Sequence, residues 1–307
     1  MRTSNLLAQA RSLLGSRHLF WLRSPELWVE LFAASNLGVL AVDICIAHAT
    51  NRFRRWPEWI PLAVSLLAPV VLAAGLWHKQ RTGRHGLWLR GGQLVGWLSV
   101  LTGLAGVLWH LQSSFFLERT LRSLTYSAPF AAPLAYTGLG FLLLMNRAER
   151  PGSKAWAQWI LFLALGGFLG NFVLSLTDHA GNGFFARTEW IPVASSAAAT
   201  GFLLVPLVAR VSRRFLDLVA AVLVAQAAVG VVGFWFHLEA NLREPGHTLW
   251  DKMVNGAPPL APLLFPNLVA LAAIGLWALV PCVDEDSRGG SWLGAARAWA
   301  CEPRQER

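Results

Sequence analysis

Apolar runs of about twenty residues, separated by short polar breaks, recur along almost the whole chain. Runs of this length are too long for barrel strands, and in lipid only helices and closed barrels satisfy every backbone hydrogen-bonding group. The pattern therefore predicts an all-α integral membrane protein with eight transmembrane helices. Their approximate positions are 27–48, 59–78, 92–111, 128–146, 156–178, 190–209, 215–237 and 258–281.

The amino-acid composition agrees with a protein that sits in a lipid bilayer. The 307 residues are 55% hydrophobic and only 14% charged, whereas soluble domains carry about 25% charged residues. Sixteen Trp stand against two Tyr, and Trp side chains are enriched where a membrane meets water. The three cysteines form no CxxC pair, so no thiolate metal site is indicated.

The basic residues predict how the chain is oriented in the membrane. The N-terminal segment, the breaks after the second, fourth and sixth runs, and the C-terminal tail hold 18 of the 26 Lys and Arg residues, and the other breaks hold 8. Positive residues concentrate on the cytoplasmic side, so both termini are predicted to lie in the cytoplasm, with the chain in the cell (inner) membrane. No basic helix or aromatic-basic platform accompanies the net charge of +9, which argues against a nucleic-acid partner.

An internal repeat divides the chain into two halves. Residues 179–192, HAGNGFFARTEWIP, match residues 48–61, HATNRFRRWPEWIP, at 8 of 14 positions. Two further matches follow in the same order, GLAGVLWHL (103–111) with GVVGFWFHL (230–238) and APFAAPL (128–134) with APPLAPL (257–263). Because four spans is an even number, the two units are predicted to have the same orientation, as parallel repeats related by an axis along the membrane normal.

This repeat sets the predicted domain boundaries. Repeat one is predicted at 26–150 and repeat two at 151–283, each with four spans. Residues 1–25 form a cytoplasmic N-terminal segment, in which apolar residues at helical spacing over 5–21 predict an amphipathic helix on the membrane surface. Residues 284–307 form a cytoplasmic tail.

The residues that both halves share and that can bind a metal all fall at span ends on the non-cytoplasmic side. They are His48, His110, His179, His237, Glu58 and Glu189. Pseudo-twofold symmetry allows either one cluster on the axis or two equivalent clusters. Two imidazoles and a carboxylate per half suit Fe, Cu or Zn. Alternatively, the two imidazoles of each half suit the axial positions of a b-type haem, whereas the absence of CxxCH excludes a covalently attached haem.

Ordinary structural roles explain part of the same pattern. A carboxylate at the start of a helix complements the helix dipole, so Glu58 and Glu189 are also what a well-formed helix start requires. Asn51 and Asn182 are typical turn residues. Secondary site candidates are Asn51, Asn182, the span carboxylates Asp43 and Asp178, and the residues Glu239 and His247 of a loop that either caps the site or is simply solvated.

Three functions are compatible with these residues. The first is a membrane protein that binds a metal or haem at its outer face for redox or metal-dependent chemistry. The second is a transporter of small solutes or ions built from parallel repeats, in which substrate sites lie at the repeat interface. The third is a non-catalytic subunit that docks on other members of a membrane complex. The sequence indicates no reaction, so it leaves open whether the protein is an enzyme.

Overall fold

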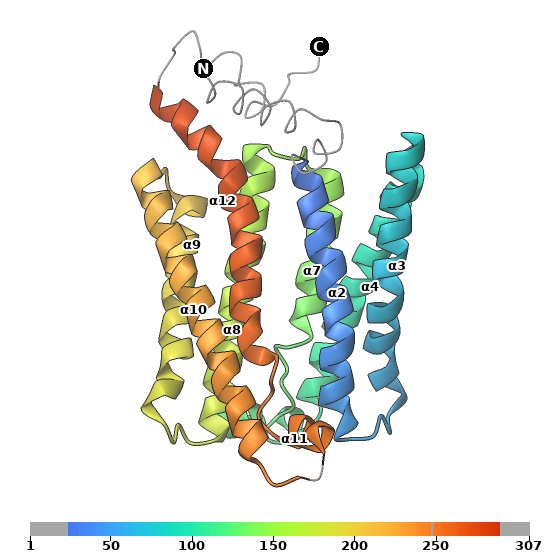
Figure 1. Cartoon of the computed structure of the whole chain (residues 1–307), viewed down its shortest axis with the longest axis vertical. Coiled ribbons are helices and arrows are strands. Elements are labelled where there is room, and N and C mark those ends of the chain that lie inside the picture. The colour runs from blue at the N-terminus through green and yellow to red at the C-terminus, as the bar shows by residue number, and fades with distance from the viewer. Residues whose placement is uncertain (1–23, 247, 289–307) are drawn as a thin grey trace, which may run out of the picture.

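The fold is known from a computed structural model, which describes residues 24–246 and 248–288. Within these ranges all regular secondary structure is helical, and the long helices run side by side along one axis (Figure 1). The all-α prediction is confirmed. The predicted surface helix at 5–21, His247 and the tail beyond Arg288 lie outside the described residues.

The first half contains four long segments and two short connecting helices. These are α2 (Pro25–Ala49), the short helix η2 (Trp56–Glu58) leading into α3 (Trp59–Thr82), α4 (Gly86–Leu111), α5 (Phe115–Glu118), α6 (Leu121–Thr125) and α7 (Leu134–Ala148). The second half follows the same order. It contains α8 (Lys154–Gly181), η3 (Arg187–Glu189) leading into α9 (Trp190–Val208), α10 (Arg213–Arg243), α11 (Leu249–Asn255), and η4 (Ala261–Leu263) leading into α12 (Leu264–Arg288).

Within the described residues, seven helices are long and apolar enough to cross a membrane. They confirm seven of the eight predicted spans. The predicted span at 128–146 differs, because α7 begins only at Leu134 and has 15 residues, which is about 22 Å against the roughly 30 Å of a hydrocarbon core. Pro129 and Pro133 explain the late start, since proline donates no backbone hydrogen bond and disfavours a helical residue before it.

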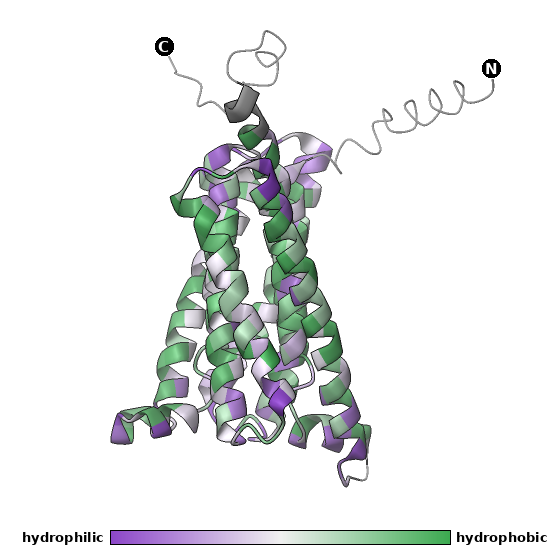
Figure 2. Ribbon diagram, turned by 90° about the vertical axis from the view of Figure 1, so that its left-hand side faces the viewer, coloured by the Kyte–Doolittle hydropathy of each residue, from purple (hydrophilic) through white to green (hydrophobic). Residues whose placement is uncertain are grey.

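Large apolar side chains cover the outside of the helices. Leu67 and Val70 on α3 are both 65% exposed, and Val224 on α10 is 68% exposed. Figure 2 shows hydrophobic residues along the middle of the bundle and hydrophilic ones near its ends. Soluble monomers rarely expose apolar patches of this extent, so the protein is a multi-pass membrane protein whose outer surface faces lipid.

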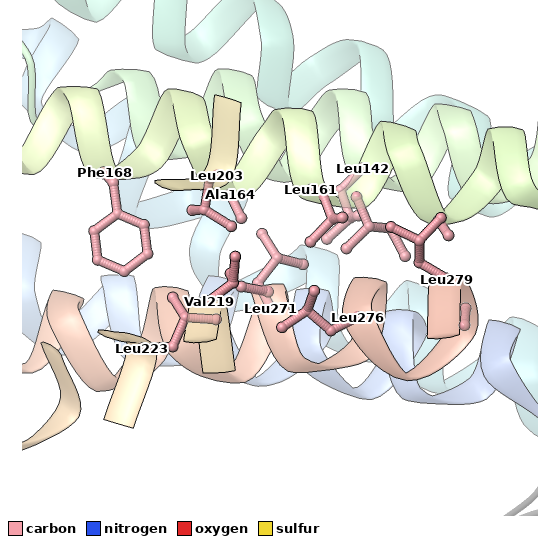
Figure 3. Close-up of a cluster of buried hydrophobic side chains, with 14 of the residues drawn as sticks. Leu142, Leu161, Ala164, Phe168, Leu203, Val219, Leu223, Leu271, Leu276 and Leu279 are labelled. Carbon is pink, nitrogen blue, oxygen red and sulfur yellow. The ribbon is translucent and has the colours of Figure 1, made fainter. Parts of the chain in front are cut away.

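The larger apolar core lies in the second half. Figure 3 shows Leu161, Ala164 and Phe168 of α8 facing Val219 of α10 and Leu271 of α12. A smaller cluster fills the first half and includes Leu37, Leu72, Val95, Leu139 and Leu143. The larger cluster also takes in Val29 of α2 and Leu142 and Met145 of α7, so it extends across the contact between the halves.

The contacts between helices occur in matched pairs. α2 packs on α3, α3 on α4 and α4 on α7; in the same way α8 packs on α9, α9 on α10 and α10 on α12. The halves meet where the first helix of each contacts the fourth helix of the other, α2 with α12 and α8 with α7. The short loop helices also cross over, because α11 contacts α2 and α6 contacts α8.

Candidate functional site

The repeated His and Glu residues gather at one end of the bundle, which we call the histidine end. His48 and His179 lie in the last turns of α2 and α8, and His110 lies in the last turn of α4. His237 lies in α10, which continues past the predicted span end to Arg243. The ends of α2 and α8 lie at the bottom of Figure 1, beside α11.

The first-half residues form one cluster. The imidazole rings of His48 and His110 meet edge to face, with centroids 6.3 Å apart and an interplanar angle of 74°. Glu58, at the start of α3, is close enough for its charge to act on His48. The last turns of α2 and α4 and the N-cap of α3 therefore each contribute one member.

The second-half residues form a matching cluster. The Nδ1 atom of His179 lies 3.5 Å from the Oε2 atom of Glu189, whose side chain is only 8% exposed. His237 is close enough to His179 for their charges to interact. Of the two arrangements that the sequence allows, the observed contacts correspond to a separate cluster in each half.

Both clusters hold one imidazole in a fixed orientation. The Nδ1 atom of His110 lies 2.9 Å from the carbonyl oxygen of Pro129, and that of His237 lies 2.8 Å from the carbonyl oxygen of Pro258. Because a carbonyl oxygen only accepts, Nδ1 carries the proton and donates it. The Nε2 atom then keeps its lone pair, which is the arrangement found in histidines that bind metals.

The remaining shared residues build the loop that carries each cluster. Phe53 and Phe184 both adopt positive φ, 48° and 50°, and their backbone N–H groups donate to the carbonyl oxygens of His48 and His179. The Phe53 ring lies 4.7 Å from that of Trp59, and Phe184 stacks at 4.1 Å on Trp190. The Phe and Trp of the repeated motif therefore have a structural role.

The two glutamates are not explained by helix capping alone. Glu58 and Glu189 occupy the N-cap positions of α3 and α9, where the helix dipole favours a carboxylate. However, neither side chain makes a capping hydrogen bond. In both, the Oε2 atom is buried and has no hydrogen-bond partner among the described residues. A buried carboxylate oxygen without a hydrogen bond is costly, so the same unusual environment occurs twice.

The secondary candidates divide into turn residues, surface residues and span residues. Asn51 and Asn182 lie in exposed turns after α2 and α8, as their residue type predicts. Glu239 forms an exposed ion pair with Arg243, 2.5 Å away on α10. After the connection that follows α10, Asp251 forms the capping box of α11 with Thr248. These contacts favour the solvated-loop interpretation.

The two span carboxylates differ from each other. Asp43 is half-buried in α2, and its charge acts on the hydroxyl of Tyr136 in α7. Asp178 is exposed, one residue before His179 in α8. Neither replaces a member of the two clusters described above.

A hydrogen-bonded group that the sequence did not predict lies next to the first cluster, on its side towards the middle of the bundle. The Tyr136 hydroxyl donates to the carbonyl oxygen of Pro61, 2.7 Å away, and lies 2.5 Å from the Ser65 hydroxyl. In the second half the matching serine, Ser196, donates to the carbonyl oxygen of Pro192 itself, at 2.6 Å. One of the chain's only two tyrosines, placed in a predicted span, was the signal for this group.

A buried ion pair at the opposite end was also missed. Arg147 Nη1 lies 2.8 Å from Glu30 Oε1, with side chains 2% and 3% exposed. Asn146 donates to the same Glu30 oxygen and accepts from the Trp156 indole, both at 3.1 Å. Glu30 stands inside an apolar run, and a carboxylate there is a signal of this kind of pair. The distribution of Lys and Arg uses Arg147 only to predict the orientation of the chain in the membrane. It does not indicate that Arg147 forms an ion pair with Glu30.

The donor atoms suit a metal ion in type, although they do not yet converge on one point. Among the side chains that the structure describes, those of residues 24–246 and 248–283, no three His, Cys, Asp or Glu groups stand close enough to hold one metal ion together. Haem would use only the imidazoles of each cluster and would give the buried glutamate oxygen no hydrogen bond or metal ligand role. The donor set of each half therefore fits a bare metal ion better than a haem.

No protein-family model, curated protein or solved structure matches this chain.

Proposed function

We propose that the protein binds a divalent transition-metal ion at each of two His–His–Glu clusters on the non-cytoplasmic face of the membrane. The observation that supports this most directly is the buried Oε2 atom of Glu58 and of Glu189, which in both has no hydrogen bond among the described residues and lies near an imidazole. A cation removes the cost of burying such an oxygen, because it supplies the missing partner.

The chemistry of each cluster follows from its donor set. Two imidazoles and one carboxylate leave a coordination position open, as in catalytic zinc sites. His110 and His237 present Nε2 as the donor atom, because Nδ1 is held by a proline carbonyl. A metal ion bound in this way polarises water or a substrate oxygen at its open position. In this proposal the three donors of each half converge on the metal ion only when it binds.

The same proposal includes a duplicated four-helix unit and an orientation. The matched helix contacts, the paired His–proline hydrogen bonds and the crossing loop helices support two parallel repeats, 26–150 and 151–283. In this arrangement α7, with the irregular segment before it, corresponds to α12 and is the eighth span. The distribution of Lys and Arg supports cytoplasmic termini in the inner membrane, and with that orientation the histidine end faces outward.

Elemental analysis of the purified full chain tests this proposal. We expect one Fe, Cu or Zn ion per cluster, half that content after His48→Ala, and none after His48→Ala combined with His179→Ala. The matched control is His78→Ala with His85→Ala, since these residues lie at the opposite end, at the end of α3 and just before α4. That control is expected to keep the full metal content.

An absorption spectrum separates the alternatives. A haem band that disappears in the same double variant would replace the bare-ion proposal with b-type haem. If the double variant binds as much metal as the wild type does, the clusters are not the site, and the proposal is wrong.

A further inference from the structure

The interior of the first half contains two groups of polar side chains, one towards each end of the bundle. At the histidine end, Asp43, Ser65 and Tyr136 lie below the metal-site residues. At the opposite end, Glu30 and Arg147 form the buried ion pair described above. Charged side chains inside membrane spans are costly and often mark proton relays.

The opposite-end group leads from the interior to the surface. Arg147 and Glu30 are almost fully buried, whereas Lys79 and Glu26 form a neighbouring ion pair, 2.7 Å long, with side chains 14% and 29% exposed. The indole of Trp88 joins the two pairs, because both cationic groups lie over its ring, Lys79 Nζ at 4.0 Å and the Arg147 guanidinium carbon at 4.6 Å.

Apolar side chains separate the two polar groups. We call this layer the apolar plug, and it consists of Leu37, Leu72, Val95, Leu139 and Leu143, each at most 8% exposed. Tyr136 and Arg147 lie on the same helix, α7, and a rise of 1.5 Å per residue puts them about 16 Å apart along it. That distance is short enough for a few water molecules to bridge once the plug parts.

Two hydroxyls beside the plug have no hydrogen-bond partner among the described residues. They are Ser99 Oγ, on a fully buried side chain of α4, and Thr137 Oγ1 on α7. Ser99 lies between Gly92, which faces Arg147, and Gly103, which faces Thr137, so its hydroxyl stands at the depth of the plug. Buried hydroxyls of this kind are usual contact points for internal water.

The second half has no such arrangement within the residues that the structure describes. The positions that match Asp43, Tyr136 and Arg147 by the offsets of the repeat are apolar: Leu174, Phe265 and Leu276. Apart from Glu189 of the His–His–Glu cluster, its buried polar residues are uncharged: Asn171, Ser196, Gln226 and Asn241. The buried side chains nearer the opposite end include Leu161, Leu216, Leu276 and Leu279. Within the described residues, the first half therefore has polar groups at both ends of its interior, whereas the second half does not have this arrangement.

We propose that the first half is a proton pathway that the apolar plug closes, and that the second half is its non-conducting counterpart. Protons enter at the histidine end, where Asp43 and Tyr136 exchange them with water, and reach the Glu30 carboxylate when the plug admits water. Apolar constrictions gate conduction by excluding water. The groups on either side of the plug, the carboxylates of Asp43 and Glu30 and the phenol of Tyr136, exchange protons, so the proton is the cargo. This pathway does not require a metal to be bound.

Proton flux into liposomes tests the proposal with a pair of matched variants. The purified full chain is reconstituted with an internal pH-sensitive dye, in chelator-containing buffer, and a potassium gradient with valinomycin drives proton entry. Leu72→Ala opens the plug, and Leu203→Ala removes the same side chain at the matching, equally buried position of the second half. We expect at least about tenfold faster flux for Leu72→Ala than for Leu203→Ala.

A second variant ties the flux to the polar groups. Asp43→Asn, introduced into the Leu72→Ala protein, is expected to return the flux to the Leu203→Ala level. Where the alanine variants do not fold, Leu72→Val and Leu203→Val serve as the same comparison. Equal flux in the matched variants, or a flux that Asp43→Asn does not change, would overturn the pathway. The metal content measured above is a separate result, so the two proposals fail independently.

Discussion

At the scale of single residues, corresponding positions in the two halves separate what packing requires of a side chain from what its polar group adds. Tyr136 and Phe265 occupy corresponding, buried positions, 3% and 4% exposed. In the first half the tyrosine hydroxyl donates a hydrogen bond to the Pro61 carbonyl oxygen and is hydrogen-bonded to the Ser65 hydroxyl. In the second half Ser196 itself donates a hydrogen bond to the corresponding carbonyl oxygen, that of Pro192. The first half therefore contains a polar group that the second half folds without.

Tyr136→Phe measures the energy of that group. We expect it to lower the free energy of unfolding by about 0.5–1.5 kcal/mol, because hydrogen bonds inside membrane proteins contribute modestly. Reversible unfolding in mixed detergent and SDS micelles provides the measurement. Tyr126→Phe is the matched control, because that tyrosine is 64% exposed, and surface changes stay within about 0.5 kcal/mol. Equal effects of the two variants would contradict a specific role for the buried hydroxyl.

At the scale of helices, glycines decide how closely the third and fourth segments of each half approach. A Cβ atom built on Gly103 would lie 2.7 Å from the carbonyl oxygen of Pro133, and one on Gly230 would lie 2.6 Å from that of Pro262. Both contacts are shorter than a real Cβ atom tolerates. Small residues at such positions let membrane helices pack backbone to backbone.

Gly103→Ala is therefore expected to destabilise the contact of α4 with α7. Overpacking costs about 1–3 kcal/mol, and we expect a lower midpoint of thermal unfolding in detergent. Gly138→Ala on α7 is the control, because a Cβ atom there would meet no described atom within 4 Å outside its own helix backbone, and alanine favours a helix over glycine by about 0.5–1 kcal/mol. A Gly103→Ala protein as stable as the Gly138→Ala protein would show that the helices do not approach this closely.

At the scale of the whole molecule, few polar contacts join the two halves within the described ranges. The Asn267 side chain on α12 donates to the Asn36 side-chain oxygen on α2, 2.5 Å away, and the Trp156 indole on α8 donates to Asn146 near the end of α7. These two contacts lie at the two places where the first helix of one half meets the fourth helix of the other.

A double-mutant cycle of Asn36→Ala and Asn267→Ala tests the contact between the halves. We expect a coupling energy of about 0.6 kcal/mol, and not more than about 1.7 kcal/mol, as found for hydrogen bonds between membrane helices. Unfolding in mixed micelles of the wild type, both single variants and the double variant gives this value. Strictly additive effects would show that the two side chains do not interact.

The members of the candidate site come from the sequence, whereas their arrangement comes from the structure. The repeat identified His48, His110, Glu58 and their partners because the motifs that carry them are local in sequence. It did not identify how they cluster, because the distance between helix ends depends on packing across the bundle. Glu30 and Arg147 were missed for the same reason: they are 117 residues apart in the chain and meet only because α2 packs against α7.

The sequence by itself determined the helical class, the membrane environment and seven spans, since each depends on a run of apolar residues that must satisfy its own backbone in lipid. It also determined which residues the halves share. Only the tertiary structure decided that the fourth segment begins late at α7, that glutamate oxygens are buried without hydrogen bonds to described residues at both helix starts, and that one half encloses charges at both ends of its interior. These properties depend on which side chains meet between helices, and hydropathy along the chain carries no information about such contacts.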